Sequence, residues 1–160
     1  MTVVLTTRLE APPDRVWELL WRPETLMHVA WPLLRFVPTE PLPRRWREGG
    51  VYAVKVRLGG VLPIGRQEIR VSSGVEGDER WLRDDGRGSL VRRWDHRVRV
   101  APSPDGGTRY TDEIDVEAGA LTPVVRAFAE LFYRHRQRRW RALVRRLPRY
   151  EALGATGSSG

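Results

Sequence analysis

Hydrophobic and polar residues alternate along most of this chain, in the pattern typical of β-strands with one buried face. The clearest alternation runs from Trp94 to Val100, and a second stretch from Thr108 to Val116 repeats it. The loop between them is rich in proline and glycine, which indicates a hairpin. The pattern predicts strands at residues 2–10, 33–37, 51–58, 64–72, 80–84, 89–100 and 108–116, with a turn at 86–88.

Two short helices are predicted between the first two strands, and one long helix after the last strand. Proline is tolerated in the first turn of a helix, so Pro13 marks the start of the first helix, and Pro23 separates it from the second. In the last segment, apolar residues recur at spacings of three, four or eight up to Leu147, which predicts an amphipathic helix. We expect Pro148 to end this helix and residues 151–160 to form a disordered tail.

The order of these elements predicts one α+β domain over residues 1–150. An antiparallel sheet with one apolar face must be covered, and the long helix is the only predicted element large enough to cover it. We therefore expect a strongly curved sheet of about six to seven strands wrapped around the C-terminal helix. A bent sheet that grips a helix leaves space between the two, and this geometry makes a pocket.

Composition narrows the classes of protein to consider. The 160 residues contain no cysteine, which excludes disulfides, zinc thiolates and cysteine nucleophiles. The first residues lack the basic and apolar regions of a signal peptide, and no segment has the roughly 20 apolar residues needed to span a bilayer. We expect a soluble cytoplasmic protein.

The chain carries a net charge of +8, and almost all of its basic residues are arginine. Such a charge can attract nucleic acid or an anionic membrane, or it can belong to a solvated surface. The dense run at residues 134–139 points all round its predicted helix and makes no single basic face. This favours the solvated surface and argues against nucleic acid, while peripheral membrane contact stays an alternative.

The strand pattern places His96 and Asp112 on the inward face of the sheet. Buried polar groups need partners, so this pair predicts a polar spot in an otherwise apolar cavity. If Val100 pairs with Thr108, the two side chains are near neighbours. Two interpretations stay open: the pair could bind a ligand or relay a proton, or it could be purely structural.

Arg136 interrupts the apolar stripe of the long helix, one turn after Phe132 and one turn before Trp140. A bare guanidinium among buried residues is costly, so we expect a partner, with Asp112 first and a ligand anion second. For Arg139 we expect a role on the helix surface.

We expect one cavity to hold the ligand, and no metal or cofactor. The three histidines lack a metal-binding spacing, and no glycine-rich phosphate loop leads from a strand into a helix. Trp17 or Trp21 is a further candidate for the cavity wall. The expected lining residues are Tyr52, Val54, Ile69, Trp94, His96, Val98, Tyr110, Asp112, Ile114, Phe128, Phe132 and Arg136.

Several motifs, in their order along the chain, carry a family resemblance. Residues 11–17 have the form of a first-helix entry, and an acidic residue before a glycine turn is followed by Trp-x-His, Gly-Thr, an Asp, a glycine and a Phe-x-x-x-Arg helix. These positions are Asp84, Gly88, Trp94, His96, Gly107, Thr108, Asp112, Gly119, Phe132 and Arg136. With these motifs the chain resembles the START-related SRPBCC (polyketide cyclase/dehydrase-like) superfamily, and their order and spacing are those of a subgroup within it.

The resemblance implies the helix-grip fold and a protein that binds or transports a hydrophobic small molecule or lipid. Membership alone does not imply a reaction, because the superfamily includes carriers as well as enzymes. One alternative is a cyclase or dehydratase that uses His96 as general acid–base, oriented by Asp112. We place it second, because Val98 and Val116 stand where the subgroup often has a second histidine and an aromatic residue. The third alternative is a basic interaction module for nucleic acid or an anionic membrane.

Overall fold

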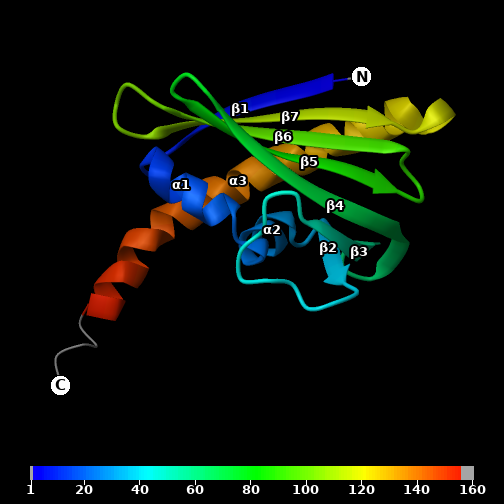
Figure 1. The fold of residues 1–160 in the computed structure, drawn as a ribbon, viewed down its shortest axis with the longest axis horizontal. Coiled ribbons are helices and arrows are strands. Elements are labelled where there is room, and N and C mark those ends of the chain that lie inside the picture. Colours follow the sequence, from blue (N-terminus) through cyan, green and yellow to red (C-terminus); the bar gives the residue numbers. More distant parts are fainter. Residues whose placement is uncertain (1, 156–160) are drawn as a thin grey trace.

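A computed structural model describes the backbone of residues 2–155 and the side chains of residues 2–147. It shows one antiparallel sheet with helices packed on one face (Figure 1). The helices are α1 (Pro13–Leu20), α2 (Pro23–Ala30), the short 3-10 helix η1 (Gly119–Leu121) and α3 (Thr122–Ala155). The strands are β1 (Thr2–Leu9), β2 (Leu34–Pro38), β3 (Val51–Leu58), β4 (Leu62–Glu76), β5 (Glu79–Gly88), β6 (Arg93–Pro102) and β7 (Thr108–Glu117).

The seven strands are ordered β1-β7-β6-β5-β4-β3-β2, so the first two strands form opposite edges of the sheet. The chain crosses between these edges through α1 and α2. Helix α3 runs diagonally across the face of the sheet (Figure 1) and packs against β1, β7 and α2. The predicted fold is confirmed: a long C-terminal helix lies on an open antiparallel sheet, and two short helices follow the first strand.

A local irregularity helps the sheet to bend. The pairing of β3 with β4 shifts between Val56 and Arg57, opposite Gly65. Gly65 has a φ of +133°, and a Cβ atom there would lie 2.5 Å from Ser89 Oγ. Only glycine accepts this combination of backbone angle and close approach. The bulge lies in the part of β4 that pairs only with β3, just before the pairing with β5 begins at Gln67, and such bulges increase the local twist of a strand.

The predicted strand at 80–84 is present but longer than expected, and the predicted turn at 86–88 is wrong, because β5 continues through those residues. Gly86 pairs with Trp94 of β6, and a Cβ atom on Gly86 would lie 2.7 Å from Gln67 Nε2. This glycine therefore serves close packing inside the sheet rather than a turn. The turn comes later, and β6 begins at Arg93 instead of residue 89.

The predicted end of the long helix at Leu147 is also wrong, because α3 continues to Ala155. A proline removes one backbone hydrogen bond and can bend a helix without ending it. Of the predicted tail, residues 151–155 belong to α3 and residues 156–160 lie outside the described part of the chain.

Two hydrophobic clusters lie between α3 and the sheet. The second half of α3 packs tightly, with Trp140 and Tyr110 fully buried and their ring centres 5.3 Å apart. The first half carries Phe132 and Tyr133 into a cluster with strands β2 to β5. None of the described helices has a stretch both long and apolar enough to cross a membrane.

Candidate functional site

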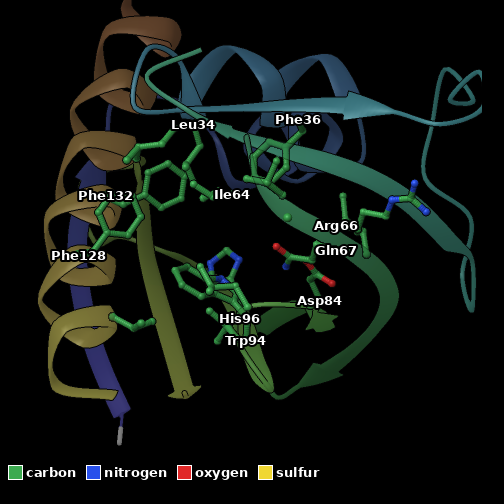
Figure 2. A pocket seen from close by; sticks show the side chains of 18 of the residues that line it. Leu34, Phe36, Ile64, Arg66, Gln67, Asp84, Trp94, His96, Phe128 and Phe132 are labelled. Atoms are coloured by element: carbon green, nitrogen blue, oxygen red, sulfur yellow. The ribbon is translucent and has the colours of Figure 1, made fainter. Parts of the chain in front are cut away.

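A cavity of about 330 Å³ separates the first half of α3 from strands β2 to β6 (Figure 2). Its wall is mainly apolar, and Phe128 and Phe132 stack on one side with ring centres 6.1 Å apart. Leu90 and Val124 line the cavity although they are 57% and 67% exposed. The cavity therefore opens to solvent between the β5–β6 connection and the start of α3.

Polar groups line the inner part of the cavity, where β4, β5 and β6 meet α3. Asp84 and His96 are paired residues on β5 and β6, and Gln67 of β4 lies beside Asp84 (Figure 2). Arg136 reaches the same cavity from α3. The inner wall therefore presents a carboxyl group, an imidazole, an amide and a guanidinium to any ligand.

His96 is held by a buried hydrogen-bond chain. Its Nε2 lies 2.8 Å from Asp112 Oδ1, and Gln137 Nε2 donates to both Asp112 Oδ2 and the Leu5 carbonyl at 2.9 Å. The predicted proximity of His96 and Asp112 is confirmed, although the predicted register is not. Thr108 pairs with Pro102 instead of Val100, which shifts the two strands by two residues.

The hydrogen bond to Asp112 determines which nitrogen of His96 remains free to accept another hydrogen bond. Burial lowers the pKa of His96, against the opposing effect of its hydrogen bond to Asp112. The imidazole is therefore neutral at pH 7 and donates its Nε2 hydrogen to the Asp112 carboxylate. Nδ1 is then left as an acceptor, on a residue that lines the cavity.

Asp84 is the cavity carboxyl that the sequence analysis noted only as part of a family motif. Burial raises the pKa of Asp84 to about 7, although the Arg70 amide donates to its Oδ1 at 2.9 Å. Its inward position between Leu82 and Gly86, both buried, is the signal that identifies it. At neutral pH this carboxyl can give or accept a proton.

The predicted pairing of Arg136 with Asp112 is wrong. Asp112 already accepts from His96 and Gln137, and Arg136 forms no ion pair with any described acidic side chain. Arg136 is only 5% exposed, its Nε has no hydrogen-bond partner, and its guanidinium carbon lies 5.0 Å from the Tyr133 ring centre. Arg139, expected on the surface, donates to the His28 carbonyl and so joins α3 to α2.

Six of the twelve expected lining residues line this cavity: Ile69, Trp94, His96, Phe128, Phe132 and Arg136. The other six lie elsewhere. Tyr52 packs on Trp46, and Asp112 lies behind His96. The remaining four are buried in the two hydrophobic clusters: Val54, Val98, Tyr110 and Ile114. Trp17 and Trp21 contact each other and do not line the cavity. The difference arises because α3 packs closely on β1 and β7, which leaves the space over β2 to β6.

Part of the cavity wall was not predicted from the sequence, including Leu34, Phe36, Val56, Leu58, Ile64, Gln67 and Tyr133. The alternation in β3 places Val56 and Leu58 on the same face as Tyr52 and Val54, but the cavity uses only the later pair. Side-chain alternation identifies a face and does not say which end of the strand borders the space. Among the described residues, no three His, Asp or Glu side chains gather closely enough to hold a metal ion.

Residues 7–145 match a family described as a domain of unknown function, DUF8410. The chain belongs to this family. No curated protein matches the sequence.

Several solved structures share the fold of this chain. Protein CV1439 from Chromobacterium violaceum has a TM-score of 0.68 and 21% identity, with 89% of this chain and 96% of that chain covered. A START superfamily protein from Mycobacterium smegmatis has a TM-score of 0.62 and 13% identity, with 91% and 98% covered. The Zhui aromatase/cyclase from Streptomyces sp. R1128 has a TM-score of 0.61 and 15% identity, with 91% and 94% covered. The helix-grip fold of the START-related superfamily is thereby shown for this chain.

Proposed function

We propose that this protein binds or carries a hydrophobic small molecule or lipid in the cavity between the sheet and α3. The observation that carries the proposal is an apolar cavity, open to solvent at one side, whose polar side chains gather at its inner wall. This is the usual form of a ligand pocket, in which a few polar groups orient a mainly apolar molecule. A volume of 330 Å³ corresponds to roughly 11 groups the size of a water molecule.

Blocking the cavity tests the proposal. Ile64 lines the cavity and points into it (Figure 2), so Ile64→Trp fills the space, whereas Val61→Trp adds the same side chain at an exposed turn. We expect decan-1-ol to raise the melting temperature of the wild type and of Val61→Trp, but not that of Ile64→Trp. Native mass spectrometry of purified wild type should also detect a bound apolar species. Absence of both effects in the wild type would contradict the proposal.

A second candidate function is proton transfer on the bound molecule, as in a cyclase or dehydratase. The observation that favours it is the orientation of His96, which Asp112 holds through Nε2 while Nδ1 remains for the ligand. A neutral imidazole held in this way can act as general base. Loss of turnover of an aromatic polyketide-like substrate in His96→Gln, with binding retained, would support catalysis. Unchanged turnover in this variant would exclude a catalytic role for His96.

A further inference from the structure

Arg136 is a charged side chain of the inner cavity wall that forms no ion pair with any acidic side chain in the described part of the chain. An arginine stays ionised in proteins, and a buried ion without a partner is strongly unfavourable. Its Nε is buried and has no hydrogen-bond partner, and its nearest rings are those of Phe132 and Tyr133. A protein can retain such a group when a ligand supplies the missing charge.

The two carboxyl groups near Arg136 have other partners. Both oxygens of Asp112 accept hydrogen bonds, from His96 and from Gln137. One oxygen of Asp84 accepts from the Arg70 amide, and burial favours the protonated form of this carboxyl. A protonated Asp84 is a hydrogen-bond donor and does not neutralise Arg136.

We infer that the ligand of this cavity is an apolar molecule with a single carboxylate, which the Arg136 guanidinium binds. This inference rests on the proposed binding function and specifies its ligand class. A guanidinium matches the two oxygens of a carboxylate with parallel hydrogen bonds, and Asp84 supplies another donor in the same cavity when its carboxyl is protonated. An amine would be repelled by Arg136, and a neutral hydroxyl would leave its charge unpaired. The apolar walls accept the remainder of the molecule.

Matched ligands test the inference. Decanoic acid and decanamide have the same size and shape and differ in charge, and decan-1-ol reports on the apolar part alone. Calorimetric titration of the wild type should show decanoate binding at least about 10-fold more tightly than decanamide, as expected for hydrogen bonds between charged groups. Arg136→Met should reduce decanoate affinity by about 10- to 100-fold and change decanamide affinity by less than about 3-fold.

Two further variants separate the role of Arg136 from general effects of charge. Arg138 is exposed on the same helix, and Arg138→Met should leave the affinities for both ligands unchanged. Asp84→Asn should retain decanoate binding, because a carboxamide still donates a hydrogen bond. Retained decanamide binding by Arg136→Met also shows that this variant is folded.

The outcomes distinguish the inference from the function on which it rests. Equal binding of decanoate and decanamide to the wild type would overturn the carboxylate inference and leave hydrophobic binding intact. Loss of decanoate binding in Asp84→Asn but not in Arg136→Met would overturn it as well, since Asp84 would then hold the polar group. If the wild type binds none of the three ligands, the proposed function itself is contradicted.

Discussion

Asp84 and His96 lie opposite each other on adjacent strands, and both side chains line the same cavity. Burial acts on both in the same sense and favours the uncharged form, so the pKa of the acid is raised and the pKa of the base is lowered. Between about pH 4 and pH 6 these two groups would be oppositely charged in water, and burial at the inner wall brings both towards neutrality. This relationship makes the stability of the protein depend on pH.

Asp84→Asn should stabilise the protein at neutral and higher pH. Burial raises the pKa of Asp84 from 3.8 to about 7, so between these values the folded chain keeps a proton that the unfolded chain releases. The contribution of Asp84 to the stability of the wild type therefore falls as pH rises through this window, by up to about 4 kcal/mol. Asparagine does not titrate and can still accept from the Arg70 amide. Urea unfolding should give the variant a higher free energy of unfolding than the wild type above pH 7, and this difference should disappear towards pH 4.

The exposed Asp78 provides the control for this experiment, because Asp78→Asn removes the same charge from a turn. Its stability should follow that of the wild type across the pH range. A wild-type stability that does not fall between pH 4 and pH 7 relative to Asp84→Asn would show that Asp84 titrates normally.

Asp112→Ala should destabilise the protein by about 3 kcal/mol, because it leaves His96 Nε2 and the Gln137 amide buried without their shared acceptor. In Asp112→Asn the pKa of His96 should fall further, since the hydrogen bond to the carboxylate is the main effect that raises it. Chemical denaturation measures the first effect and NMR titration of the imidazole measures the second. An unchanged midpoint in Asp112→Ala would mean that water satisfies both groups.

Arg136→Met should not destabilise the ligand-free protein. If Arg136 formed an ion pair with Asp112, replacing it would lower the free energy of unfolding by about 3–5 kcal/mol. The structure has no such pair, because Asp112 pairs with His96. We expect a free energy of unfolding that is unchanged or higher by up to about 2 kcal/mol. The pKa of Asp84 should rise above about 7, because the nearby positive charge that lowers it is gone. A loss of stability as large as that of a broken ion pair would show that Arg136 has an internal counterion.

Phe132 and Phe128 should differ in their contribution to stability although they stack on each other. Phe132 is 2% exposed and belongs to the main cluster, so Phe132→Ala should cost about 3–5 kcal/mol. Phe128 borders the open cavity and is only partly buried, so Phe128→Ala should cost less than about 2 kcal/mol. Thermal unfolding of the two variants compares them directly. Equal losses would mean that the wall of the cavity closes around Phe128.

Alternation predicts most of the sheet because its apolar residues face the helix along most of each strand. It fails at β5, where Gly86 and Gly88 resemble a turn in sequence but allow close packing between strands. The inward direction of His96 and Asp112 follows from the same periodicity, whereas the partner of Arg136 does not. That partner depends on how α3 rotates over the sheet, and this rotation brings Gln137 rather than Arg136 to Asp112.

The placement of β1 at the far edge from β2 has a consequence for how the chain assembles. The pairing of Thr2 with Asp115 joins residues from nearly opposite ends of the domain, and such distant contacts slow folding. During synthesis, β1 has no strand to pair with until β7 has left the ribosome, and α3 emerges later still. The nascent sheet therefore exposes its apolar face until the last helix arrives, and the cavity comes into existence only in that final step.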